Sequence, residues 1–286
     1  MLPADLGTVV TYNPLSLSAD TALVDVLKQW NTIDYHPWPI IESDRALVGI
    51  VSLGDIVRTV QSLALACHVT GHAVDRRLSE PKARDIMSTR LVTLSPGNLP
   101  EQALRLLLQH KFQSLPVVDA ERLVGMVTTT DFLRELSFGS SSLCRSAVTQ
   151  WLDRSPESVD CDASLDDAAF LLMQTGAACL AVLRGDLPLG VVTRRDIQLA
   201  KCRAELSPWL GEEFQLPGPV TLYQLAIEAP VLRPGDRLSQ AAEAMVNHAR
   251  GSVAVVNQAG RLVGALTETS LLRAMEGNAK WVVGSH

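Results

Sequence analysis

Four short turns each join an apolar segment to a hydroxyl residue and, three positions later, to an aspartate or a serine. They read GIVSLGDI from Gly49, GMVTTTDF from Gly125, GVVTRRDI from Gly190 and GALTETSL from Gly264. The start of a helix offers unpaired N–H groups and the positive end of the helix dipole, which favour phosphate. Hydroxyls can donate to phosphate oxygens, and a carboxylate can accept from the vicinal hydroxyls of a ribose. The spacing therefore suits a sugar phosphate.

The third turn adds Arg194 and Arg195, whose guanidinium groups suit phosphate contacts. The fourth turn has Ser270 in place of the acid, so we expect its site to be weak or empty. A simpler alternative stays open, because Ser, Thr and Asp are also preferred helix N-caps, which stabilise by about 1 kcal/mol without a ligand. The candidate ligand contacts from the turns are Ser52, Asp55, Thr128, Thr130, Asp131, Thr193, Arg194, Arg195, Asp196 and Thr267.

The elements around each turn follow one repeating order of strand, helix, strand, strand and helix. In the second repeat, LVTLSP (91–96) predicts a strand, LPEQALRLLLQHK (99–111) a helix, LPVVDAERLVGMVT (115–128) two strands, and TDFLREL (130–136) a helix. The intervals between turns are long, short and long, which predicts two tandem pairs. We expect the repeats at residues 8–66, 84–138, 145–206 and 222–280, in an α+β fold.

These four turns, the strands of the PVVD type, and the approach segments ARDIMSTR and AVTQWLD together resemble the cystathionine-β-synthase (CBS) domain family, over roughly residues 8–280. The resemblance implies that two repeats pack sheet to sheet into a module with two clefts. It implies adenosyl ligands in those clefts, with AMP, ADP or ATP first and S-adenosylmethionine or NAD as alternatives. Four repeats without a catalytic domain are similar to the gamma subunit of AMP-activated protein kinase and its prokaryotic relatives.

Gamma-like subunits also place basic residues just before the second strand of a repeat, where they reach phosphates. The corresponding region here contains His36, His110, Lys111, His248 and Arg250, of which only His36 aligns strictly with the usual position. The third repeat has no basic residue there. The resemblance therefore adds His36 to the candidate ligand contacts, and Thr93, in the first predicted strand of the second repeat, completes the set.

The composition limits the classes of function. The chain has 286 residues, 47% of them hydrophobic, which is enough for about two globular domains. Its net charge of -6 argues against unspecific nucleic-acid binding, which needs a basic surface. No apolar run is long enough to span a membrane, and the N-terminus does not resemble a secretory signal. Five cysteines without a CxxC motif fit reduced thiols, so we expect a cytoplasmic protein.

Other chemistry has little support in the sequence. Cys67, His68 and His72 lie close together, but Gly71 disfavours a helix that would align them, and no fourth ligand follows, so we expect no metal site. No Cys/His arrangement indicates a hydrolase. The aromatic segment WNTIDYHPW (30–38) favours core packing over a ligand cleft.

We therefore expect a non-catalytic sensor of adenine nucleotides whose ligand binding modulates an unidentified partner protein. We also expect a homodimer. The alternative is a structural or interaction scaffold whose clefts no longer bind ligands, which the missing acid at Ser270 and the incomplete set of basic residues favour.

Overall fold

The structure is a computed structural model that describes residues 6, 9–32, 37–70, 81–206, 221–227, 230–248 and 250–278, with side chains of 30–32, 64–70 and 202–206 excepted. The chain divides into two compact units. Unit 1 comprises residues 1–128 and 202–218, and unit 2 comprises residues 129–201 and 219–286. We describe each unit by itself. No helix of the described residues is long and apolar enough to cross a membrane.

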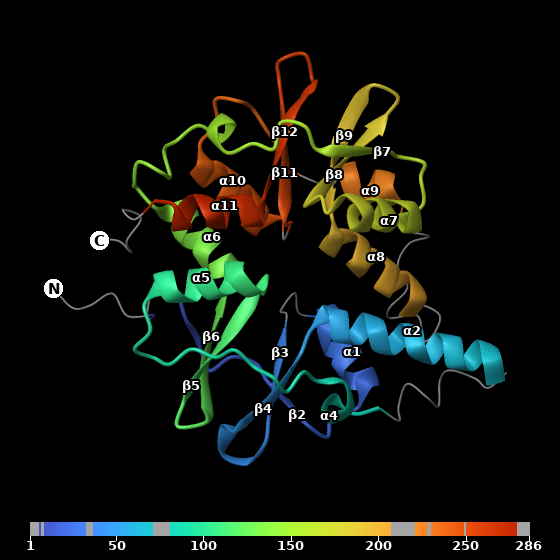
Figure 1. The fold of residues 1–286 in the computed structure, drawn as a ribbon, viewed down its shortest axis with the longest axis vertical. Helices are drawn as coiled ribbons and strands as arrows, with labels where there is room; N and C mark the ends of the chain where they lie inside the picture. Colours follow the sequence, from blue (N-terminus) through green and yellow to red (C-terminus); the bar gives the residue numbers. More distant parts are fainter. Residues whose placement is uncertain are drawn as a thin grey trace. The chain divides into compact units, whose positions relative to one another are not determined.

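The first repeat, in unit 1, forms a three-stranded sheet with two helices (Figure 1). Strand β2 runs parallel to β3, and β3 pairs with β4 in an antiparallel hairpin. Helix α1 buries Leu23, Val26 and Leu27, which lie at helical spacing on one face. The elements are β2 (Leu17–Ser18), α1 (Leu23–Thr32), β3 (Trp38–Ile41), the 3-10 turn η2 (Ser43–Arg45), β4 (Leu47–Val51) and α2 (Leu53–Thr70).

Helix α2 continues to Thr70, immediately before Gly71, and so passes residue 66, where we expected the first repeat to end. Cys67 and His68 therefore lie on this helix. Their side chains and the whole of His72 lie outside the described residues, and so does the linker that follows.

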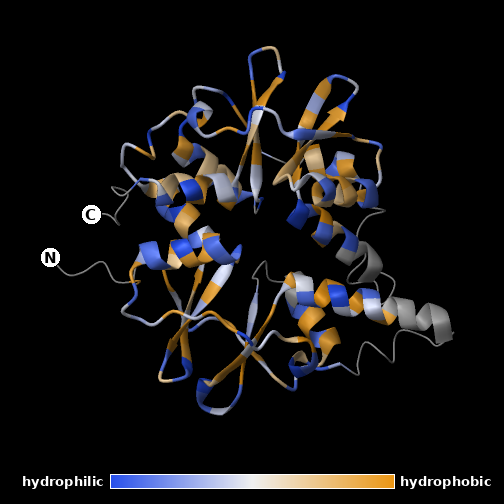
Figure 2. Cartoon of the chain, viewed as in Figure 1, coloured by the Kyte–Doolittle hydropathy of each residue, from blue (hydrophilic) through white to orange (hydrophobic). Residues whose placement is uncertain are grey.

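The second repeat contributes α4 (Ala83–Ile86), α5 (Pro100–His110), β5 (Ser114–Asp119) and β6 (Arg122–Thr128) to unit 1. Helix α5 mixes hydrophilic and hydrophobic residues, and its buried side includes Ala103, Leu104 and Leu107 (Figure 2). The expected strand over 91–96 is wrong in extent, because only Leu94 pairs, in a parallel bridge to Val117. The next amide, of Ser95, donates instead to Asn98 Oδ1 at 2.6 Å, and the chain turns away from the sheet.

Unit 2 holds the third and fourth repeats, each with a parallel strand pair and an antiparallel hairpin, in sheets β7-β8-β9 and β10-β11-β12. The third repeat consists of η3 (Val148–Gln150), β7 (Glu157–Asp160), α7 (Leu165–Thr175), β8 (Cys179–Arg184), β9 (Leu187–Thr193) and α8 (Arg194–Leu206). The fourth consists of α9 (Leu222–Ile227), β10 (Val231–Leu232), α10 (Leu238–Asn247), β11 (Ser252–Val256), β12 (Leu262–Thr267) and α11 (Glu268–Glu276).

Helix α6 (Thr129–Phe138) belongs to unit 2, although the sequence assigns it to the second repeat. It packs against α10 and α11 and buries Phe132, Leu133 and Leu136. The local sequence predicts this helix and its apolar face. It does not predict which other helices cover that face, because that depends on tertiary packing.

Small residues line the contact between the two hairpins of unit 2. Cys179 and Val191 of the third repeat pack with Ala254 and Ala265 of the fourth, and all four are buried. Strand β9 lies against β11, and β8 against β12. This sheet-to-sheet packing brings the turn after β9 close to the residues that precede β11.

The glycine that opens each of the four turns makes room for the approach segment of the other repeat in its pair. At Gly190, an added Cβ would lie 2.9 Å from the backbone carbonyl carbon of Ala226, closer than real Cβ atoms come. The approach segments also pair with the last strands of the neighbouring repeats, through β1 (Thr11–Tyr12) with β6, Ser88 with Ile50, and Asp153 with Ala265. The contacts at the four glycines are Gly49 with Met87, Gly125 with Val10 and Thr11, Gly190 with Ala226, and Gly264 with Leu152 and Asp153.

Candidate ligand-binding site

The hydroxyl and acid of the first and third turns form reciprocal capping boxes. In the third, Thr193 N–H donates to Asp196 Oδ2 at 2.8 Å, and Asp196 N–H donates to Thr193 Oγ1 at 3.3 Å. Ser52 and Asp55 make the same pair of bonds, at 2.8 and 3.3 Å. The hydroxyl residue is therefore the N-cap, and the acid stands three positions later. The acid therefore lies inside the first turn of the helix.

The capping box commits one carboxylate oxygen and leaves the other for a second partner. Asp196 Oδ2 also accepts from the Thr193 hydroxyl at 2.7 Å, which fixes the orientation of the carboxylate. Both residues are buried, with Thr193 8% and Asp196 6% exposed. Oδ1 of this acid is consequently the atom through which the turn can meet a ligand or another side chain.

The fourth turn has a cap without a charge. Thr267 N–H donates to Ser270 Oγ at 2.8 Å, and the Ser270 hydroxyl donates to the Thr267 carbonyl at 2.8 Å. Ser270 thus replaces the acid in the cap but supplies no carboxylate to a ribose.

The second turn divides at the boundary between the units, with Thr128 ending β6 in unit 1 and Asp131 on α6 in unit 2. Asp131 pairs with Arg134 at 3.3 Å on its own helix. Thr129 is buried and Thr130 half-buried. Thr93 is exposed beside the Leu94 bridge, and His36 lies outside the described residues.

An arginine from the fourth repeat meets the acid of the third turn. Arg250, just before β11, donates from Nη1 to Asp196 Oδ1 at 3.4 Å, and its side chain is 14% exposed. In the first turn the corresponding partner of Asp55 is Arg58, which lies on the same helix and is 71% exposed. Among the described residues, the third turn alone joins its acid to an arginine of the other repeat.

Gly251 forms a bare patch of backbone beside this pair. An added Cβ there would lie 3.8 Å from Thr193 Oγ1 and 3.9 Å from Glu268 Oε2. The Glu268 N–H donates to the Gly251 carbonyl at 2.9 Å, which holds the start of α11 at this point. Thr193, Asp196, Arg250 and Glu268 therefore gather around Gly251, and this cluster is called the Gly251 site.

The Gly251 site includes residues that the sequence did not predict or indicated only weakly. Glu268 was not a candidate, although an acid at the first position of the helix was visible beside the hydroxyl of Thr267. Arg250 was named only among the basic residues of its region, and its partner could not be predicted. Arg194 was a phosphate candidate, but it donates to the Leu172 carbonyl at 3.1 Å and so reaches α7. Arg195 is half-buried next to the cap.

Ser114 and Ser252 are buried, and a buried hydroxyl is expected to have a hydrogen-bond partner. Ser114 pairs across β5–β6 with Thr128, and Ser252 pairs across β11–β12 with Thr267. Neither hydroxyl has a hydrogen-bond partner among the described residues. Side chains two apart share a face of a strand, so Ser252 lies on the same face as Ala254, at the contact between the hairpins.

Cys179 occupies the corresponding position of the third repeat, opposite Thr193. Burial raises the pKa of this thiol to about 12, with smaller contributions from the carboxylates of Asp153 and Asp196. The thiol is therefore protonated at neutral pH and provides no nucleophilic thiolate.

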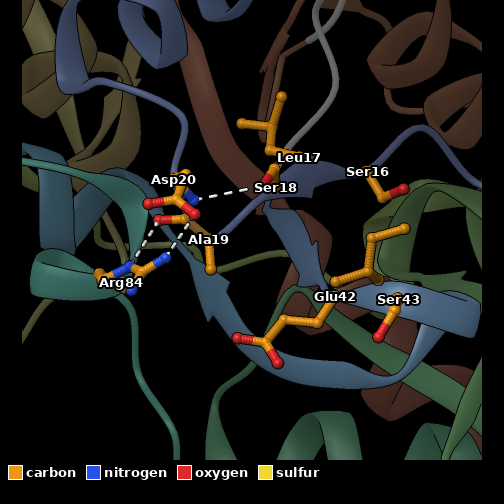
Figure 3. A pocket seen from close by; sticks show the side chains of 9 residues that line it. Ser16, Leu17, Ser18, Ala19, Asp20, Glu42, Ser43 and Arg84 are labelled. Atoms are coloured by element: carbon orange, nitrogen blue, oxygen red, sulfur yellow. Dashed lines mark hydrogen bonds and ion pairs between the residues drawn. The ribbon is translucent and has the colours of Figure 1, made fainter.

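A separate pocket of about 490 Å³ lies at the hairpin end of the first repeat (Figure 3). Asp20 pairs there with Arg84 at 2.6 Å and with Lys82 at 2.8 Å, and the Lys82 hydrogen bond is the main cause that lowers the pKa of Asp20. None of the candidate ligand contacts lines this pocket. It is lined by Ser16, Leu17, Ser18, Ala19, Asp20, Ile41, Glu42, Ser43 and Arg84.

The described residues contain one group that could offer three metal ligands, Asp160, Cys161 and Asp162. Cys161 is buried in the core of the third repeat, and the two acids are exposed. The Cys161 sulfur lies 3.7 Å from Asp162 Oδ1, as a hydrogen bond. Exposed acids of this kind need no ion, so the group is not assigned as a site.

Comparison with known proteins decides the family. The CBS domain matches four segments of the chain, 6–62, 83–138, 148–201 and 225–277. The chain belongs to the CBS-domain family. Its four-repeat α+β fold is confirmed, as is the sequence-based resemblance to this family.

Three relatives illustrate the extent of the similarity. MJ1225 of Methanocaldococcus jannaschii, described as a putative archaeal homolog of g-AMPK, matches in structure with a TM-score of 0.72 and 19% identity, over 95% of this chain and 99% of that one. A conserved protein from Pyrococcus horikoshii matches with a TM-score of 0.60 and 16% identity, over the same shares. A 33.4 kDa protein from Thermofilum pendens is 28% identical over 55% of this chain and 51% of its own length. The CBS chain thus spans about half of that relative, and the structural matches at these identities speak for the fold.

Proposed function

We propose that this CBS protein is a non-catalytic regulatory protein that binds an adenine nucleotide at the Gly251 site. The observation that carries the proposal is the contact between Asp196 of the third repeat and Arg250 of the fourth, beside the Thr193 hydroxyl. A carboxylate for the ribose and a cation for the phosphate then come from two repeats of one unit. AMP, ADP and ATP are the first ligand choices, with S-adenosylmethionine and NAD as alternatives.

The ligand would replace Arg250 as the partner of Asp196, and it would give Arg250 a new anionic partner. Asp196 keeps Oδ2 in the capping box and turns Oδ1 to the ribose hydroxyls. Arg250, only 14% exposed, then loses this carboxylate and keeps its other interaction. An anionic group on the ligand would take the place of the carboxylate beside the guanidinium, where a charge-assisted hydrogen bond is strong. This balance of charge favours a nucleotide over adenosine.

Regulation follows from differential binding. A ligand shifts a protein between two arrangements only when it binds one of them better. A nucleotide that takes Asp196 from Arg250 replaces a direct contact between the third and fourth repeats with contacts through the ligand. We propose that a partner protein responds to this change.

The test is calorimetric titration of the protein with AMP, with three variants. Asp196→Asn and Arg250→Met should each weaken AMP binding about tenfold or more, the loss expected for a charge-assisted hydrogen bond. Ser270→Ala removes a cap from the same unit but no charge from the Gly251 site, so this variant should bind AMP as the wild type does. Wild-type affinity in both Asp196→Asn and Arg250→Met would refute the site. Native mass spectrometry of protein purified without added nucleotide would identify a ligand that it carries.

The homodimer is a separate proposal. Light scattering at micromolar concentration should give about twice the chain mass of 30.9 kDa, and a value equal to the chain mass would contradict it.

The capping boxes favour a second function, that of an interaction scaffold. Asp55 and Asp196 each have a structural partner within their own turn, so a ligand is not needed to explain either acid. A scaffold would show no rise in melting temperature with AMP, ADP, ATP, NAD or S-adenosylmethionine. A nucleotide site would be stabilised by about 2.7 kcal/mol at a ligand concentration of 100 times Kd.

A further inference from the structure

The pocket at the hairpin end of the first repeat contains none of the candidate nucleotide contacts. Its volume of about 490 Å³ is that of a small-molecule site. Its walls come from the ends of β2 and β3 and from α4, all within unit 1. Leu17 and Ala19 are almost fully buried, so a ligand would meet chiefly polar side chains. Those in the lining are Ser16, Ser18, Asp20, Glu42, Ser43 and Arg84.

One side of this pocket has an excess of positive charge. Asp20 meets two cations, Arg84 at 2.6 Å and Lys82 at 2.8 Å, so one negative and two positive charges lie together there. The Nε of Arg84 donates to the Ala19 carbonyl at 3.4 Å, which helps to hold the guanidinium in place. The Nη1 of Arg84 forms no hydrogen bond or ion pair with the described residues. It can therefore donate to an anionic group of a ligand.

The remaining charge in the lining is the carboxylate of Glu42. This residue follows β3 and is exposed, and its side chain has no hydrogen-bond or ion-pair partner among the described residues. In Figure 3 the side chain extends from the end of β3 toward the side on which Asp20 and Arg84 lie. A carboxylate in this position can accept from an ammonium group.

The equivalent side chains of the third repeat contact each other instead. The register shifts of the two antiparallel hairpins align Glu42 with Arg184, and the contacts of the turn glycines align Arg84 with Tyr223. Arg184 lies over the Tyr223 ring, 4.5 Å from its centroid. In the first repeat, an acid and a cation occupy these two positions and form no ion pair with each other. Both remain available to a ligand.

We propose that this pocket binds a small zwitterion with one carboxylate and one primary ammonium group, the class to which free amino acids belong. The carboxylate lies against Nη1 of Arg84, and the ammonium group lies against Glu42. A ligand with a single charged group meets only one of these partners, so the pocket prefers the zwitterion to a simple acid or a simple amine. The site is separate from the proposed nucleotide site, and its failure would leave that proposal unchanged.

The experiment follows the δ1-methyl group of Ile41, which lines the pocket, by NMR of the full chain with labelled isoleucine methyl groups. The probes are glycine, 4-aminobutyrate and 6-aminohexanoate, which differ in the separation of their charges. Butyrate and n-butylamine each lack one charge. Ile41→Val identifies the signal, and the methyl group of Ile197, in the core of the third repeat, is the internal control. At least one aminocarboxylate should shift Ile41 saturably and bind about tenfold or more tighter than butyrate and n-butylamine.

Charge variants test whether the two named side chains bind the ligand. Glu42→Gln and Arg84→Met should each weaken its binding about tenfold or more. Asp44→Asn removes an exposed acid from the adjoining turn η2, outside the lining, and should change the affinity by less than about threefold. The proposal is overturned if no aminocarboxylate shifts Ile41 saturably, if butyrate binds as tightly, or if either pocket variant keeps wild-type affinity. An equal loss in Asp44→Asn would also overturn it, because the effect would then come from general surface charge.

Discussion

Replacement of Arg250 by methionine should weaken unit 2 before any ligand is added. Arg250 and Asp196 are 14% and 6% exposed, so neither charge is well solvated, and their contact of 3.4 Å lies at the long end of hydrogen-bond distances. A hydrogen bond to a charged group contributes about 1.5–3 kcal/mol. The long distance places the expected loss in the lower half of that range, at about 1.5–2 kcal/mol.

The pair contribution is isolated by a double-mutant cycle, because Arg250 has a further interaction as well. Asp196→Asn keeps an amide oxygen for the capping box and removes the charge that Arg250 meets. Hydrogen exchange of the amides in α8 and β11, followed by mass spectrometry, reports the local opening free energy of both elements. The two single variants and the double variant should give a coupling of about 1–2 kcal/mol.

The first turn supplies the control. Arg58 is 71% exposed where it meets Asp55, and exposed ion pairs contribute at most about 1 kcal/mol. The Arg58→Met and Asp55→Asn cycle should therefore give a clearly smaller coupling. A coupling below about 0.5 kcal/mol between Arg250 and Asp196, or a value equal to that of the first turn, would refute the argument that burial distinguishes the two pairs.

Three further outcomes are expected. Gly190→Ala should lower the free energy of unfolding by about 1–3 kcal/mol, seen as a lower melting temperature, because the new Cβ meets the Ala226 backbone. Gly54→Ala should leave the melting temperature unchanged, because the nearest neighbour of its Cβ would be 3.6 Å away. Cys179 should resist iodoacetamide at pH 8.5 in the native protein. Its raised pKa also predicts stability that is full below about pH 9 and lost as pH rises toward 12, a loss that Cys179→Ala should reduce in alkaline unfolding curves. Ala120→Gly should raise the free energy of unfolding by up to about 1 kcal/mol, since residue 120 has a φ of 44°.

Local patterns were enough to predict the repeats and most of their elements. Hydrophobic spacing predicted a helix over 99–111, and α5 spans Pro100–His110, because its buried positions recur at helical intervals and Pro100 marks its first position. The predicted first strand of the second repeat was too long. Its apolar pattern does not show that the Asn98 side chain accepts a hydrogen bond from the Ser95 amide.

The parts that sequence could not predict all depend on a second segment of chain. The four turn glycines were recognised as a pattern, but the reason for them lies in approach segments tens of residues away. The hydroxyl and acid could be read as a cap or as a ligand contact, and the structure shows that the cap is formed in the first and third turns. Ligand binding by the same atoms remains a prediction.

The asymmetry among the four turns indicates where a regulatory signal can arise. In the first two turns the acid is followed three residues later by an arginine of the same helix, Arg58 or Arg134, and each forms that local pair. The third turn has Leu199 at the equivalent position, and its acid is met by Arg250 of the neighbouring repeat. Across its own pair, Asp55 accepts from the neutral hydroxyl of Ser88 at 3.4 Å. A ligand that takes Asp196 from Arg250 instead breaks an ion pair between two repeats, so under the proposed function this turn is the one at which occupancy most alters the packing of a pair.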